Sequence, residues 1–213
     1  MMRIPLKALS LSVALVALTA SCAGSEDKEK PPGRGVGEVC QSFAASGESA
    51  SALKEIAGDG RLKDDGSDPS GVLKALRSAD GVVEGAELLG TPYCKLKSAT
   101  NEAHILEITF REALAVDDSD AEDKKHFTYY RSGKTALVSD RLASIYFQCK
   151  LKDSSKSFII NGTLERTNKI NVPPKEVAAN QILLLNSSAS KVSGELGCQN
   201  SQLAKGAPQP LSH

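Results

Sequence analysis

Residues 142–166 of this chain read LASIYFQCKLKDSSKSFIINGTLER. Apolar and polar residues alternate through 142–151 and again through 157–166, a period of two that is typical of β-strands with one buried face. The residues predicted to face inward are Ile145, Phe147, Cys149 and Leu151 in the first strand and Phe158, Ile160 and Leu164 in the second. The polar residues 152–156 between the two runs predict an antiparallel hairpin.

The rest of the chain supplies further strands and flanking helices. Weaker alternation predicts strands at 93–97, 105–111 and 127–131, and helical spacing of apolar residues predicts helices at 38–57 (with a break near 47–51), 72–78 and 175–196. We expect Ser70 to cap the second helix and Gly197 to end the third. The order predicts an α+β fold in which a mainly antiparallel sheet is packed on one face by the N-terminal helices and the long C-terminal helix.

Composition argues against a nucleic-acid partner. The 213 residues contain 26 Lys and Arg against 26 Asp and Glu, whereas proteins that neutralise phosphates carry an excess of cations. The length suits a single domain and is short for the two lobes of a transporter's substrate-binding lipoprotein.

The N-terminal 21 residues have the layout of a secretory signal peptide. Arg3 and Lys7 precede an apolar run, 8–20, that is too short to span a bilayer comfortably. The run ends in Leu18-Thr19-Ala20-Ser21-Cys22, which resembles a bacterial lipobox. The resemblance implies cleavage before Cys22, a diacylglycerol on its sulfur and acylation of its amine, hence a membrane partner through Cys22; the alternative is ordinary secretory cleavage near Ala20.

Four boundaries follow from these patterns. We expect a signal peptide at 1–21, a lipid-anchored flexible linker rich in charge, Pro and Gly at 22–37, one extracytoplasmic domain at 38–201 and a disordered tail at 202–213.

The other four cysteines, Cys40, Cys94, Cys149 and Cys198, are expected to form two disulfides, because an exported chain with an even number of cysteines usually pairs them. Three pairings are possible. We favour Cys40–Cys94 and Cys149–Cys198, since each ties a helix to a strand within one half of the chain. Each closure is worth about 4 kcal/mol in the chain-entropy description. No spacing suits a metal site or a redox dithiol.

Catalytic motifs are weak. Ser25–Lys28, Ser51–Lys54 and Ser188–Lys191 match SxxK, the nucleophile and base of penicillin-recognising enzymes, but the accompanying SDN and KTG motifs are absent. No local pattern supports His104 or His126 in a catalytic triad. We therefore expect no catalytic residue.

Three further patterns are candidates for binding or modification sites. Acidic clusters at 117–123 and 64–68 lack EF-hand spacing and are interpreted as solvated loops, so no metal or other cofactor is expected. Asn161-Gly162-Thr163 and Asn186-Ser187-Ser188 match the glycosylation pattern, although Asn186 falls in the middle of a helix. A candidate ligand surface is formed by His126, Phe127, Tyr129, Tyr130 and Arg131. The alternative is an edge strand whose rings cover the sheet.

The lipobox, the linker and the local strings Val39-Cys40, Pro92-Tyr93-Cys94, 145–149 (IYFQC) and 195–198 (ELGC) together resemble small secreted lipoproteins of actinobacteria, a family without an assigned activity. The resemblance implies location and framework. Our first hypothesis is a non-enzymatic, membrane-anchored extracytoplasmic domain that binds a protein, a cell-wall component or a small ligand. The second is a serine-type cell-wall hydrolase or penicillin-recognising enzyme using Ser51 or Ser188.

Overall fold

The computed structural model describes residues 33–45, 47–58, 60–78, 92–113, 126–152 and 157–211. Its helical elements are η1 (Val36–Glu38), η2 (Cys40–Ser42), α1 (Gly47–Ala57), α2 (Pro69–Ser78) and α3 (Pro174–Leu196). Its strands are β1 (Leu62–Asp64), β2 (Pro92–Ser98), β3 (His104–Ala113), β4 (Thr128–Arg131), β5 (Thr135–Val138), β6 (Leu142–Leu151), β7 (Ser157–Arg166), β8 (Cys198–Gln199) and β9 (Gln209–Pro210). The predicted signal peptide, Cys22, Ser25 and the acidic loop 116–125 lie outside the described residues.

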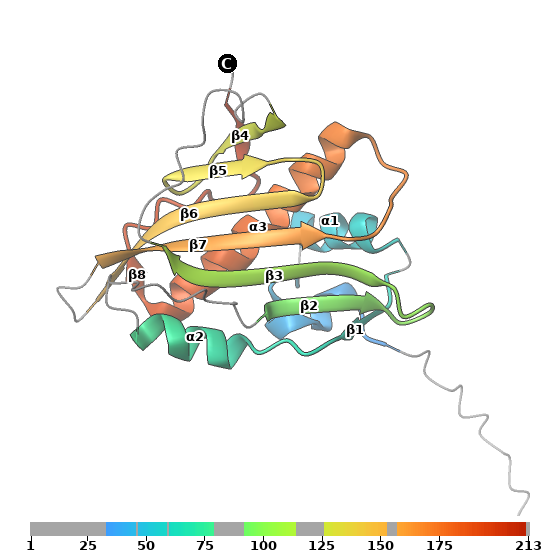
Figure 1. The fold of residues 1–213 in the computed structure, drawn as a ribbon, viewed down its shortest axis with the longest axis horizontal. Helices are drawn as coiled ribbons and strands as arrows, with labels where there is room; N and C mark the ends of the chain where they lie inside the picture. Colours follow the sequence, from blue (N-terminus) through green and yellow to red (C-terminus); the bar gives the residue numbers. More distant parts are fainter. Residues whose placement is uncertain are drawn as a thin grey trace, which may run out of the picture. The chain divides into compact units, whose positions relative to one another are not determined.

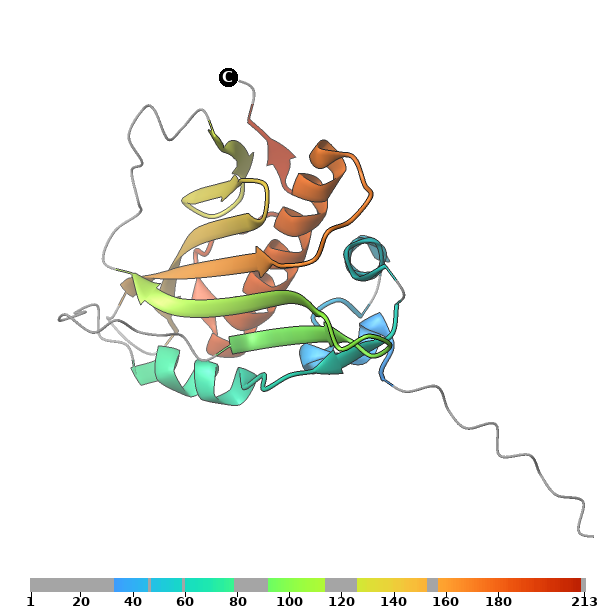
Figure 2. The same cartoon turned by 45° about the vertical axis from the view of Figure 1, so that its right-hand side comes forward.

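The strands form one antiparallel sheet in the order β1-β2-β3-β7-β6-β5-β4-β9, with β8 paired to β6 (Figure 1). The β6–β7 hairpin predicted from residues 142–166 lies at its centre, with Phe147 opposite Ile160 and Ile145 opposite Gly162. The helices lie on one side of this sheet, and Figure 2 shows α3 crossing behind the central strands. The predicted α+β architecture is therefore confirmed.

The core lies between the sheet and the helices. Along β6, Ala143, Ile145, Phe147 and Cys149 are fully buried, while Lys150 is exposed. Strands β3 and β7 repeat the pattern, because alternate residues of a strand point to opposite faces. Burial of these aliphatic side chains at about 25 cal/mol per Å² is the main force that holds the helices on the sheet.

The two expected disulfides are present with the favoured pairing. Cys40–Cys94 joins η2 to β2, and Cys149–Cys198 joins β6 to β8, immediately after the left-handed turn at Gly197 (φ 73°) that ends α3. Both therefore fix the ends of helical segments to strands of the sheet.

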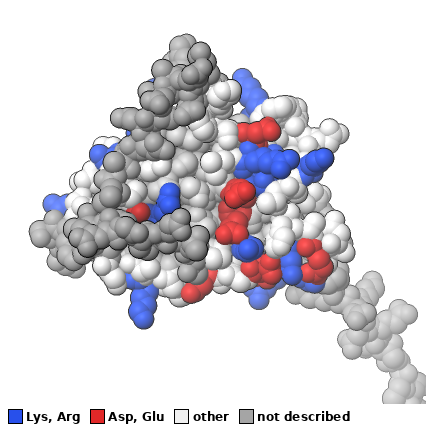
Figure 3. All heavy atoms as spheres, in the orientation of Figure 1, with Lys and Arg blue, Asp and Glu red and all other residues white. Residues whose placement is uncertain are grey.

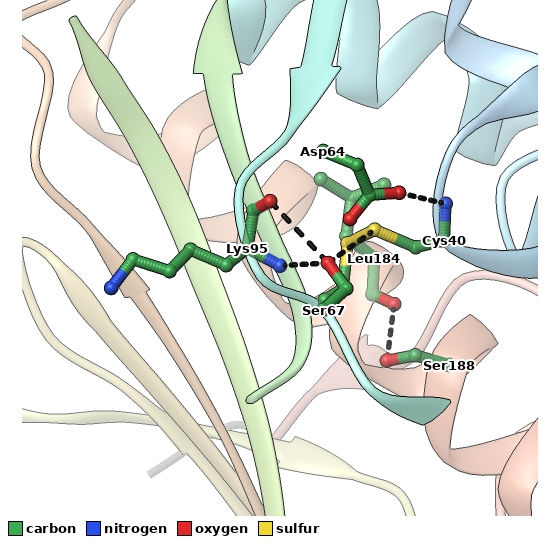
Figure 4. The surroundings of a disulfide bond; sticks show 7 residues. Cys40, Asp64, Ser67, Lys95, Leu184 and Ser188 are labelled. Carbon is green, nitrogen blue, oxygen red and sulfur yellow. Dashed lines mark hydrogen bonds between the residues drawn. A yellow bond between two sulfur atoms is a disulfide. The ribbon is translucent and has the colours of Figure 1, made fainter. Parts of the chain in front are cut away.

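The environment of the first disulfide is drawn in Figure 4. The Cys40 N–H donates to the Asp64 carboxylate over 3.4 Å, and the Cys40 sulfur lies 3.7 Å from the Ser67 hydroxyl. Ser67 in turn accepts a 2.8 Å hydrogen bond from the Lys95 N–H. The disulfide is thus part of a hydrogen-bond network that connects η2 with β1, with the segment that follows β1, and with β2. Its role is structural.

The N-terminal part differs from the prediction in three places. The expected helix over 38–57 is instead η1, η2 and α1, and the expected break near 47–51 is wrong, since these residues begin α1. The backbone is left-handed at Cys40, Gln41 and Ser42. The expected linker already belongs to the fold by Arg34, which forms a β-bridge with Leu62. Asp68 rather than Ser70 precedes α2, and its carboxylate accepts the Gly71 N–H at 2.8 Å.

The C-terminal part corrects a second expectation. Residues 202–211 are not a disordered tail: Gln209–Pro210 form β9, which pairs with β4 at the edge of the sheet. The described residues between 33 and 211 accordingly belong to one compact unit, wider than the predicted domain at 38–201. The sequence of this segment has no regular spacing of apolar residues from which the pairing could be predicted, because the segment is held by backbone and polar contacts.

Candidate functional site: a pocket at the edge of the sheet

A cavity of about 660 Å³ lies where β4, the first turns of α3 and the C-terminal segment meet. Its apolar lining comes from Val138, Pro174, Ala178, Ala179, Ala207, Pro208 and Pro210. Its polar lining includes His126, Thr128, Tyr130, Ser139, Asp140 and Lys175. Mostly apolar concave sites of this size with a few polar groups are typical of small-molecule binding.

Strand geometry divides the predicted ligand surface between two faces. Thr128 and Tyr130 line the cavity, whereas Tyr129 and Arg131, which alternate with them along β4, do not. His126 also lines the cavity, and Phe127 does not. The structure therefore brings His126 and Tyr130 of the five predicted residues together at one site.

Tyr130 is the most deeply placed polar residue of this lining. Its side chain is 6% exposed, and burial raises the pKa of its phenol, so that it stays a neutral hydrogen-bond donor. No hydrogen bond joins its hydroxyl to another described residue. A hydroxyl at a cavity wall without a described protein partner is a position where a ligand atom or water is stabilised.

The charged groups at the cavity differ in their surroundings. Lys175 is exposed and forms no ion pair within the described part of the chain. Asp140 lies near the buried guanidinium of Arg166, which donates to the backbone carbonyls of Asn168 and Asp140. Burial, and then the charge of Arg141, lower the pKa of Arg166, while Asp140 acts in the opposite direction. The negative charge of Asp140 is thus offset by two nearby cations.

The cavity wall formed by residues 207–210 is held in place by Asn186, a buried residue of α3. The Asn186 amide donates to the carbonyls of Ala204 at 2.9 Å and Gly206 at 3.1 Å, while its own carbonyl accepts the Ser132 hydroxyl at 2.6 Å. The Ser132 hydroxyl also accepts the Ala204 N–H at 3.1 Å. The sequence analysis did not predict this role of Asn186. The signal that could have indicated it is the position of a polar residue on the apolar side of a long helix.

Both glycosylation-type asparagines are buried. Asn161 is 1% exposed and donates to Ser144 at 2.8 Å, and Asn186 is 2% exposed. A glycan needs an exposed acceptor, so neither folded site offers one.

The serine candidates are not arranged for nucleophilic attack. Ser188 is fully buried, and its hydroxyl donates to the carbonyls of Leu184 and Leu185. Its partner in the motif, Lys191, forms an ion pair with Glu195 at 2.8 Å. Ser51 is exposed on α1, and no hydrogen bond is found between its hydroxyl and Lys54. A nucleophile needs a base within hydrogen-bond reach, and the described residues supply none to either serine.

The acidic cluster at residues 64–68 is engaged in structural contacts. Asp65 pairs with Lys97 at 3.4 Å and with His104 at 3.6 Å, and Asp64 and Asp68 bind backbone N–H groups. Within the described ranges, no group of three or more His, Cys, Asp or Glu side chains is placed to hold a metal ion.

The opposite face of the sheet carries charges of both signs side by side (Figure 3). Lys95 pairs there with Glu107 at 3.1 Å, and Lys97 with Glu102 at 2.9 Å. These pairs contrast with Lys175, whose charge is not matched by a described carboxylate.

None of the helices described in the structure has both the length and the apolar character of a membrane span. Comparisons with known protein families, with curated proteins and with solved structures find no match to this chain.

Proposed function

We propose that this protein is a lipid-anchored extracytoplasmic domain that binds a small ligand in the pocket at the edge of its sheet. The pocket is the observation that carries the binding part: a cavity of about 660 Å³ with a mostly apolar lining, where the Tyr130 hydroxyl and the Lys175 charge have no partner among the described residues. The described residues hold no competing arrangement of nucleophile and base.

The anchoring part rests on the sequence. The signal-like residues 1–21 end in Ala20-Ser21-Cys22, and two acyl chains on one residue are sufficient for stable membrane attachment. The two disulfides support an oxidising compartment, because such bonds are rare in reducing ones. A protein or cell-wall partner is compatible with this location, and nucleic acid is not expected.

Mass spectrometry of protein purified from the membrane of the native host tests the anchor. We expect an N-terminal peptide that begins at Cys22 and carries a diacylglycerol, with a further acyl chain where the amine is modified. The Cys22→Ser variant should leave the membrane fraction, whereas Cys22 recovered as a free thiol would refute the anchor.

Amide chemical shifts of the chain from residue 23 onward, titrated with octanoate, octanamide and octylammonium, test the pocket. We expect at least one probe to shift the resonances of Tyr130, Val138 and Ala178 selectively. The Ala178→Phe variant, which fills the cavity, should abolish this response, and Ala103→Phe, an exposed position after β2, should not. Shifts absent from the pocket with all three probes would exclude it as a binding site.

A further inference from the structure

We propose that the pocket selects amphiphilic anions: a carboxylate head held at Lys175 and an apolar body packed along the prolines and alanines. This inference deepens the proposed function and rests on it. The inference assigns the chemical class of the ligand, whereas the existence of the pocket alone does not identify that class.

The apolar part of the pocket has no aromatic ring besides Tyr130, and its walls are formed by three prolines and three alanines with Val138. Pro174 belongs to α3, whereas Pro208 and Pro210 belong to the C-terminal segment, so the body of a ligand would lie between these two walls. Small and rigid side chains leave a smooth apolar surface and lose little conformational entropy when a ligand packs on them.

The head group is specified at the first turn of α3. Lys175 lines the cavity, and its ammonium group forms no ion pair with a described residue. No side chain caps this helix at Pro173, and the Lys175 backbone N–H makes no hydrogen bond to a described residue, while those of Glu176 and Val177 bond to the Pro173 carbonyl. An anion at this position would accept hydrogen bonds from the backbone N–H and from the ammonium group of Lys175. The helix dipole adds to the attraction.

Tyr130 supplies a further donor. Its hydroxyl belongs to a side chain that is more than nine-tenths buried and lines the same cavity from β4. A carboxylate has two oxygens and about four acceptor positions, so it can satisfy this hydroxyl together with the donors at Lys175.

Asp140 is the one acidic residue of the lining, and it does not reverse this preference. Arg166 and Arg141 lie close enough to influence one another electrostatically, and Asp140 acts on Arg166 with the opposite sign. Among the lining residues, Lys175 and Asp140 carry opposite formal charges, and Arg166, whose guanidinium donates to the Asp140 carbonyl, adds a positive charge beside Asp140. The charge without a described partner is therefore that of Lys175, and this arrangement disfavours an ammonium head.

Isothermal titration with octanoate, octanamide and octylammonium chloride separates the head group from the apolar body. We expect octanoate to bind at least about tenfold more tightly than either other probe, with the advantage shrinking as salt screens the charge of Lys175. The Lys175→Met variant should reduce the preference to less than about threefold while octanamide binding is unchanged. Lys169→Met, an exposed lysine before α3, is the matched control.

Two outcomes overturn the inference and are distinct from failure of the proposed function. Octanamide or octylammonium binding in the pocket as tightly as octanoate would leave a binding site without anion selectivity. An octanoate preference that survives in Lys175→Met would place the head group elsewhere. If none of the three probes bound in the pocket, the proposed function and the inference would fail together.

Discussion

The hydroxyl of Ser132, in the turn between β4 and β5, donates a 2.6 Å hydrogen bond to the side-chain carbonyl of Asn186 in the middle of α3. Both residues are buried, and the pair is extended by the bonds from Asn186 and Ser132 to residues 204–206. One polar cluster thereby connects the edge of the sheet, the long helix and the C-terminal segment. Because that segment continues into the pocket wall, the cluster also shapes the candidate site.

Replacement of Asn186 by Ala should destabilise the fold and open the pocket. The change leaves the Ser132 hydroxyl and the carbonyls of Ala204 and Gly206 without their partner, and unsatisfied buried polar groups cost about 1–3 kcal/mol. We expect the free energy of unfolding in urea to fall by about 2–3 kcal/mol. Exchange of the Leu211 amide hydrogen, which bonds to the Tyr129 carbonyl at 2.8 Å, should accelerate.

Asn180→Ala is the control on the same helix. Asn180 makes one exposed hydrogen bond, to Glu55 at 2.7 Å, so its loss should change stability by less than about 0.5 kcal/mol. Equal effects of the two substitutions would mean that the buried cluster does not hold the C-terminal segment.

Replacement of Gln41 by Gly should stabilise the protein. Gln41 is exposed and has φ 57° and ψ 30°, the left-handed region that costs a residue with a Cβ about 1 kcal/mol and glycine almost nothing. The greater entropy of glycine in the unfolded chain offsets part of the gain. We expect the free energy of unfolding to rise by about 0.5 kcal/mol. Lys169 is an exposed loop residue whose φ is not positive, so Lys169→Gly should lower the free energy of unfolding instead.

The central architecture was predictable because long strands alternate over many residues, as Ile145, Phe147 and Cys149 do in β6. Among the short strands, β4 was predicted from weak alternation over 127–131, whereas β1, β5, β8 and β9 were not, since runs of two to four residues seldom show a clear period. In the pocket, the sequence singled out His126 and Tyr130 from local composition. It did not single out Lys175, because only the pairing of β9 with β4 encloses the cavity beside the start of α3.

Acidification should reveal the ion pairs at Glu102. Hydrogen bonds from Lys63, and then from Lys97, hold the pKa of the Glu102 carboxyl below its ordinary value of 4.5. A carboxyl group with a lowered pKa in the folded state stabilises the protein above its unfolded pKa, and this contribution is lost as the pH falls through the folded pKa. We expect the melting temperature of the wild type to fall more steeply than that of Glu102→Gln between about pH 5 and pH 3.

The two curves should converge at the acidic end and in high salt, because the pairs are exposed to solvent. Glu48→Gln, an exposed substitution in the first turn of α1, should retain the slope of the wild type. Parallel curves for the wild type and Glu102→Gln would show that these bonds do not form in solution.

Removal of the Tyr93 hydroxyl should be tolerated or favourable. Tyr93 is fully buried, its ring packs edge-on against Phe110 with centroids 5.3 Å apart, and its hydroxyl has no hydrogen-bond partner among the described residues. Burial, and secondarily the charge of Glu195, raise its pKa above the ordinary value, as expected for a hydroxyl without compensation. Tyr93→Phe keeps the ring and should raise the free energy of unfolding by about 1 kcal/mol.

Tyr129→Phe, on a half-buried side chain, should give no such gain. A loss of stability in Tyr93→Phe would instead reveal a bound water that satisfies the hydroxyl, and measurement of both variants in urea distinguishes the two cases.

Two glycine-to-alanine substitutions should have opposite signs. A Cβ added at Gly162 in β7 would lie 2.5 Å from the Phe110 Cε1 atom and 3.4 Å from a methyl group of Leu185, so the ring that also packs on Tyr93 would have to move. Overpacking of this kind costs about 1–3 kcal/mol. At Gly194 in α3 nothing lies within 4 Å of the added atom, and alanine in a helix is favoured over glycine by about 1 kcal/mol. We therefore expect Gly162→Ala to lower the urea midpoint and Gly194→Ala to raise it.

Since the Phe110 ring is the obstacle at Gly162, Phe110→Leu should lower the free energy of unfolding less in the Gly162→Ala background than in the wild type. Strictly additive effects of the two substitutions would show that Gly162 is needed for a reason other than the space that this ring occupies.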